Sequence, residues 1–191
     1  MPERTIDFGK FGARGVRAFE AVADRLDGLV GFVSSPVSSR RGLLARLHYL
    51  RRSGRAWEAA RAAGLMVTDR TVKAWLEGKR SPSKVNLERI EVAYRAVRRR
   101  NVARYLVARL NREGRGTRVE FHPLNQSQVA RPFQRVLEFR TVNVRRWDRI
   151  VEAWVRGDMG ALDEAWVDDV AVDLGSSWGQ YDYVSAIGFA A

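Results

Sequence analysis

A short basic segment carries the residues best suited to contact nucleic acid. Arg70 and Lys73 can reach guanine edges or phosphates, and Thr71 can contact a thymine methyl group or a phosphate. Their spacing places them on or near one face of a helix. We therefore expect a DNA-contacting surface formed by this helix and by the loop and helix start that follow it: Thr68, Asp69, Arg70, Thr71, Lys73, Lys79, Arg80 and Lys84.

Local signals predict where this helix begins and ends. Thr68 and Asp69 are typical of an N-cap residue followed by an acidic first turn. Gly78 is expected to end the helix, because glycine readily takes the left-handed conformation that follows a last turn. The opposite face is apolar and is expected to pack in the core through Val72, Trp75 and Leu76.

The preceding residues fit the first helix of a helix-turn-helix, in which a supporting helix meets the helix that reads the major groove. A helix-turn-helix needs a small residue where its two helices meet and an apolar residue that anchors the second helix in the core. Ala62 and Val72 have the spacing that these two residues usually have. If Ala62 is the contact residue, the turn position at which glycine is favoured is occupied by Met66, and Gly64 lies two residues before it. Either the turn is longer than usual, or Met66 has a strained backbone.

Charge is distributed unevenly along the chain, whose formal net charge is +12. Residues 40–118 hold 22 basic and 6 acidic side chains, whereas residues 147–191 hold 2 and 9. The basic stretch suits a polyanion, because cations on phosphates release condensed counterions, and the acidic stretch suits a protein partner. A long basic helix is expected from Lys84 to Leu110, and it should follow the DNA backbone through Arg98, Arg99 and Arg100.

Hydrophobic periodicity indicates how the rest of the chain folds. Apolar residues recur at helical spacing in 14–30, and again around 43–50 and 56–63. From Thr117 to His122 polar and apolar residues alternate as in a half-buried strand, and residues 135–144 alternate less cleanly. Helices around 147–154 and 162–166, a short strand at 170–174 and a candidate edge strand within 181–189 follow.

The expected fold is mainly α with a small α+β C-terminal unit. It has a helical helix-turn-helix domain followed by a β-β-α-α-β domain. We expect three parts: an N-terminal helix and Ser/Pro linker at 1–39, the helix-turn-helix DNA-binding domain with its long basic helix at 40–114, and an acidic α+β interaction or dimerisation domain at 115–191.

The composition excludes several classes of site. The chain has no cysteine, which excludes a disulfide scaffold, a thiolate zinc site and a cysteine nucleophile, and its only imidazoles are His48 and His122. We expect no metal, no cofactor and no catalytic residues, and therefore a protein that is not an enzyme. No apolar run approaches the ~20 residues that span a bilayer, and the start lacks the pattern of a secretory signal. We expect a cytoplasmic, nucleoid-associated protein without a membrane partner.

Two resemblances to known families extend this interpretation. The run from Trp75 to Gly78, followed by Pro82, Leu87 and Ile90, resembles the phage-repressor-like helix-turn-helix family, in which a Trp-x-x-Gly helix end, a proline and another helix recur. Most of the chain resembles the telomere terminal protein family of actinobacterial linear chromosomes and plasmids in the order and pattern of its segments. That second resemblance lies in residues 43–47, 70–72, 87–90, 116–120, 135–139, 147–154, 157 and 162–167.

The terminal-protein resemblance implies a protein that binds single-stranded or folded telomeric DNA and offers a side-chain hydroxyl on which a polymerase starts DNA synthesis. Its implied partners are DNA, a DNA polymerase and a second telomere-binding protein. In the family the hydroxyl lies in the loop after the first strand of the α+β region. The matching loop spans residues 122–130, where Ser127 is the only hydroxyl; the family residue is a threonine. Thr117 and Thr141 are lesser candidates.

A transcriptional regulator is the alternative that the same basic segment allows. It would bind duplex operator DNA as a homodimer through the α+β unit and would carry no covalent nucleotide. For either function, Trp178 is a candidate exposed anchor for a partner, whereas Trp147, Trp154 and Trp166 are expected in the core.

Overall fold

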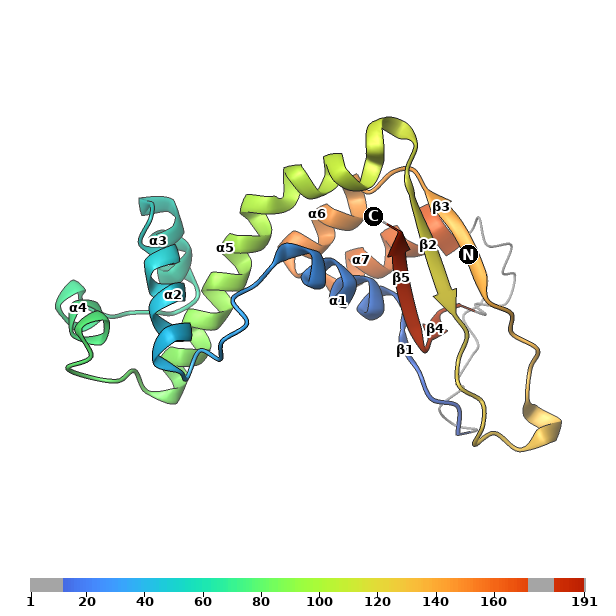
Figure 1. Ribbon diagram of the computed structural model, residues 1–191, viewed down its shortest axis with the longest axis horizontal. Coiled ribbons are helices and arrows are strands. Elements are labelled where there is room, and N and C mark those ends of the chain that lie inside the picture. The colour runs from blue at the N-terminus through green and yellow to red at the C-terminus, as the bar shows by residue number, and fades with distance from the viewer. Residues whose placement is uncertain (1–11, 172–180, 191) are drawn as a thin grey trace. The chain divides into compact units, whose positions relative to one another are not determined.

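The chain folds into two compact units, seen in a computed structural model that describes residues 12–171 and 181–190 (Figure 1). One unit comprises residues 30–102, and the other joins residues 12–29 to residues 103–171 and 181–190. The expected boundaries after residues 39 and 114 differ from these. The N-terminal segment belongs to the second unit, because β1 (Val16–Arg17) pairs antiparallel with β4 (Tyr183–Val184).

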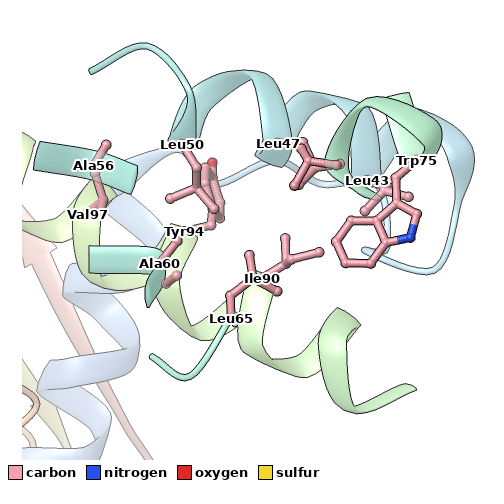
Figure 2. Close-up of a cluster of buried hydrophobic side chains, with 12 residues drawn as sticks. Leu43, Leu47, Leu50, Ala56, Ala60, Leu65, Trp75, Ile90, Tyr94 and Val97 are labelled. Carbon is pink, nitrogen blue, oxygen red and sulfur yellow. The ribbon is translucent and has the colours of Figure 1, made fainter. Parts of the chain in front are cut away.

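The unit of residues 30–102 is helical. Serine caps start two of its helices: Ser39 Oγ accepts the Gly42 amide at 3.0 Å, and Ser53 Oγ accepts the Ala56 amide at 3.2 Å. The helices are α2 (Arg40–Leu50), α3 (Gly54–Ala62), α4 (Asp69–Glu77) and the first part of α5 (Lys84–Asn111). They share one apolar core, shown in Figure 2, in which Leu47, Leu50 and Ile90 are fully buried.

A buried arginine ties three segments of this unit together. Arg46 in α2 pairs through Nε with Glu91 of α5, and its Nη1 donates to the carbonyls of Ser35 at 2.9 Å and Gly42 at 3.0 Å. Its Nη2 donates to the Val33 carbonyl at 3.2 Å. A buried charge is tolerated only when it is paired and hydrogen-bonded, and Arg46, 4% exposed, meets both conditions.

The second unit is an α+β structure. Its sheet has the order β3-β2-β5 and is antiparallel throughout, with Val119 opposite Val142 on one side and Phe189 on the other. Side chains along β2 are alternately buried and exposed, as expected of a half-buried strand. The elements are α1 (Ala18–Val30), the last part of α5, η2 (Arg112–Gly114), β2 (Thr117–His122), η3 (Arg131–Phe133), β3 (Arg140–Val144), α6 (Asp148–Arg156), α7 (Met159–Trp166), η4 (Val167–Ala171) and β5 (Ala186–Ala190).

Tryptophans fill the core of the α+β unit. Trp147, Trp154 and Trp166 are buried, as predicted. The Trp166 ring lies 5.4 Å from the ring of Phe121 on β2, and the Trp147 ring lies 4.9 Å from that of Phe189 on β5. The helices that carry these indoles therefore cover the apolar face of the sheet. Trp178 lies outside the described residues.

The predicted strand at 170–174 is wrong in the part that the structure describes. Val167–Ala171 forms a π-helical turn that continues α7, and positions 172–174 lie outside the described residues. Helical spacing prevails here because it buries Trp166 and Val170, four residues apart, on the same side. The strand that completes the sheet is β5, which begins within the candidate edge segment and ends one residue beyond it, at Ala190. The second predicted strand is shorter than expected and begins only at Arg140.

We expect Arg46→Ala to lower the free energy of unfolding by about 3–5 kcal/mol, because the substitution leaves Glu91 and three carbonyls without their buried partner. Urea denaturation followed by circular dichroism measures this loss. Arg41→Ala is the matched control, since Arg41 is an exposed arginine of the same helix; it should change stability by less than about 0.5 kcal/mol. Equal effects of the two substitutions would contradict the role given to Arg46.

Candidate nucleic-acid interface

The ends of α4 confirm the predicted helix boundaries. The hydroxyl of Thr68 accepts the Thr71 amide at 3.2 Å, and Thr71 Oγ1 lies 3.0 Å from the same oxygen. Gly78 has φ +78° and closes the helix, with its amide bonded to the carbonyls of Ala74 and Trp75. On the inner face Val72 and Trp75 are buried, and Figure 2 shows Trp75 directed toward the core residues of α2. The outer face is therefore left for a ligand.

The turn between α3 and α4 resolves the two alternatives that the sequence left open. The turn is the longer one, six residues from Ala63 to Thr68, and Gly64 takes the left-handed conformation at φ +84°. The alanine of α3 that is fully buried in the core is Ala60, whereas the predicted contact residue, Ala62, is exposed. The physical cause is Leu65, which is 1% exposed: it must reach the core from inside the turn.

The outer face of α4 and the loop after it form a hollow of about 710 Å³. Four of its lining side chains are cations and one is a carboxylate. The residues lining it are Arg70, Thr71, Lys73, Ala74, Glu77, Lys79 and Arg80. The structure thus brings five of the eight residues predicted from this segment into one concave surface, and it adds Glu77, which the sequence did not single out.

Ion pairs shape the charge of this hollow. Glu77 lies 2.8 Å from Lys79 Nζ and 3.9 Å from Lys73 Nζ. The hydrogen bond from Lys79 lowers the pKa of Glu77, and the same bond raises the pKa of Lys79. Both groups therefore stay charged across the physiological pH range. At the other end of α4, the Asp69 carboxylate forms an ion pair with Arg51 of the same chain at 3.3 Å.

Two arginines at opposite ends of α2 hold the two ends of α4. Arg40, the first residue of α2, donates to the carbonyls of Trp75 and Leu76 in the last turn of α4. Arg51, the C-cap of α2, pairs with Asp69 in the first turn. A cation at a helix C-terminus also interacts favourably with the helix dipole. Neither arginine could be predicted as a partner of α4, because nothing local in the sequence marks a contact across 35 or 18 positions.

The remaining predicted cations lie on α5. Lys84, at its first turn, and Arg100 are exposed. Arg98 differs from the expectation: its Nη2 donates to the Val30 carbonyl at 2.9 Å, and its guanidinium lies 5.8 Å from the Tyr49 ring. Arg99 is half-buried and has a partner within the protein. Arg98 is thus directed into its own unit, and we leave it out of the interface.

The loop that was matched to the terminal-protein acceptor lies in the α+β unit, between β2 and β3. Ser127 is exposed there, and its amide donates to Asn125 Oδ1 at 2.9 Å. The loop is held by two hydrogen bonds between Gln126 and the backbone of Arg135, at 2.8 and 2.9 Å. Of the lesser candidates, Thr141 is exposed. Thr117 is fully buried, and its hydroxyl donates to the Leu110 carbonyl at 2.6 Å, so it is unsuited to the role.

Comparison of the chain with protein-family models finds no match, and neither do comparisons with curated proteins and with solved structures. Within the described residues, no three His, Asp or Glu side chains gather in a way that could hold a metal ion. Across the same residues, none of the helices is both long and apolar enough to cross a membrane.

We expect Arg40→Ala to loosen α4, because the last carbonyls of the helix lose a charged donor. Hydrogen bonds to charged groups contribute roughly 1.5–3 kcal/mol, so amide exchange in residues 69–78 should accelerate by about tenfold or more. Hydrogen-exchange mass spectrometry measures this, with Arg41→Ala as the control. Unchanged exchange in α4 of Arg40→Ala would show that the arginine does not hold the helix.

Proposed function

We propose that the chain is a DNA-binding protein in which α3 and α4 form a helix-turn-helix and α4 enters the major groove. The observation that carries this proposal is the two-sidedness of α4. Its inner face is fixed in the core by Val72 and Trp75, while its outer face presents the cationic hollow. A helix that is anchored on one side and basic on the other is the arrangement by which such domains read duplex DNA.

The cations divide into two groups by their place around α4. Arg70 and Lys73 project from the helix itself: Arg70 is suited to base edges, where arginine pairs with guanine, and Lys73 can reach a base edge or a phosphate. Lys79 and Arg80 in the following loop, and Lys84 at the start of α5, are suited to phosphates, which fix the register of the helix on the duplex. Binding to chromosomal DNA would place the protein at the nucleoid.

We expect Arg70→Ala to reduce sequence preference, by roughly 1–3 kcal/mol at one base pair, because a bidentate contact to a base is lost. Lys73→Ala should weaken binding more uniformly across sequences. If Lys73 contacts a phosphate, a plot of the logarithm of the association constant against the logarithm of the salt concentration should become less steep, by about one unit of slope. Fluorescence anisotropy with duplex DNA at several salt concentrations measures both effects.

Arg156→Ala is the control for this experiment, since Arg156 is an exposed arginine of the α+β unit that pairs with Glu152 at 3.0 Å. Its binding should equal that of the unchanged protein. If Arg70→Ala and Lys73→Ala also bind with unchanged affinity, preference and salt slope, α4 does not contact the DNA.

A terminal protein is the finer proposal, and the exposure of Ser127 favours it. In that role the Ser127 hydroxyl attacks the α-phosphorus of a deoxynucleoside triphosphate held by the polymerase. A phosphodiester bond to Oγ forms, pyrophosphate leaves, and the hydroxyl proton passes to the polymerase site or to water. The chain supplies only the hydroxyl and the DNA contact, so it is not itself the enzyme, and its partners are DNA, a polymerase and a second telomere-binding protein.

Intact mass and peptide mapping of nuclease-treated protein from its native host test this role. We expect a residual nucleotide on Ser127, its loss in Ser127→Ala and its retention in Ser127→Thr, because threonine offers the same nucleophile. Thr141→Ala, at an exposed threonine of β3, is the control and should keep the nucleotide. An unmodified mass across well-recovered native protein would favour the alternative, a transcriptional regulator that binds duplex DNA as a homodimer.

A further inference from the structure

One carboxylate lies among the cations of the α4 hollow. Glu77 is on the same side of α4 as Arg70 and Lys73, since positions seven and four residues apart share a helix face. Its side chain is 36% exposed, so it is accessible to a ligand in the hollow. The Glu77 carboxylate would repel a DNA phosphate beside it. We therefore expect the group that contacts Glu77 in a complex to be a hydrogen-bond donor and not an anion.

The position of Glu77 within α4 is also unfavourable for the free protein. It is the last residue of the helix, where the dipole disfavours a negative charge. Lys79 offsets this by its 2.8 Å contact and keeps the carboxylate ionised. An acidic residue at a helix C-terminus, where a neighbouring cation offsets the unfavourable dipole, is more typical of a functional position than of a structural one.

We propose that Glu77 is a specificity-determining residue that accepts a hydrogen bond from the N4 amino group of a cytosine in the major groove. This inference rests on the proposed function. In the major groove the amino donors belong to cytosine and adenine, and adenine presents the N7 acceptor beside its donor. A carboxylate has only acceptors, so N7 repels it, whereas cytosine offers the amino group without that neighbour.

The surrounding lysines leave Glu77 able to pair with a base. Lys73 and Lys79 approach different carboxylate oxygens of Glu77, Oε1 at 3.9 Å and Oε2 at 2.8 Å, and their own side chains are 76% and 75% exposed. A carboxylate has about four lone-pair sites, so these contacts leave acceptor capacity for a base. The 2.8 Å contact with Lys79 also restricts the carboxylate before DNA arrives, and a group that is already restricted loses less entropy on binding.

Selection from a randomised duplex library tests the inference, with the full chain and the variants Glu77→Gln and Glu77→Ala. The unchanged protein should enrich cytosine at one position, by roughly 5- to 150-fold over the other bases. Glu77→Gln should enrich adenine there, because a glutamine amide pairs with adenine N6 and N7. Glu77→Ala should enrich no base at that position while the preference set by Arg70 remains. Glu88→Gln, at an exposed glutamate of α5, is the control and should keep cytosine.

The outcomes separate this inference from the proposed function. If the unchanged protein selects a sequence and Glu77→Gln keeps the same base at every position, the assignment of Glu77 is overturned while DNA binding by α4 stands. Equal enrichment of all bases by the unchanged protein, with retained affinity, overturns it in the same way. If the unchanged protein binds no duplex, the proposed function fails and the inference fails with it. Circular dichroism of each variant shows that the fold is intact.

Discussion

The buried guanidinium of Arg46 is the interaction on which the helical unit depends. It joins the segment before α2, α2 itself and α5 through four donated hydrogen bonds. Its guanidinium carbon also lies 5.2 Å from the Tyr94 ring, at the centre of the apolar core. Removing a charge from water is costly, and this cost is offset only while all three segments keep their places. Arg46 therefore specifies one arrangement of α2 against α5.

That arrangement fixes α4 in turn. Because α2 is held against α5, Arg40 and Arg51 at its two ends lie where they can bind the two ends of α4. The outer face of α4 and the loop that follows it then place Arg70, Lys73, Glu77 and Lys79 around one hollow. The proposed DNA contact thus follows from a chain of arginine contacts that begins in the core and ends at the surface.

The sequence predicted features that depend on neighbouring residues and missed those that depend on distant ones. The start and end of α4 were predictable because a Thr68 cap and a left-handed Gly78 act within a few residues. The buried alanine of α3 is Ala60, two residues before the predicted Ala62, and the turn is longer than usual because Leu65 is buried from within it. Arg98 points inward because it donates to a carbonyl 68 positions away in the sequence. The charge of a segment does not reveal which way an individual side chain points.

The central claim is that DNA contacts the outer face of α4. Amide hydrogen exchange of the full chain, with and without a random-sequence duplex at low salt, tests it most directly. We expect the duplex to slow exchange chiefly in residues 68–80, which span α4, its cap and the basic loop. Protection confined to the α+β unit, with exchange in residues 68–80 unchanged, would contradict it.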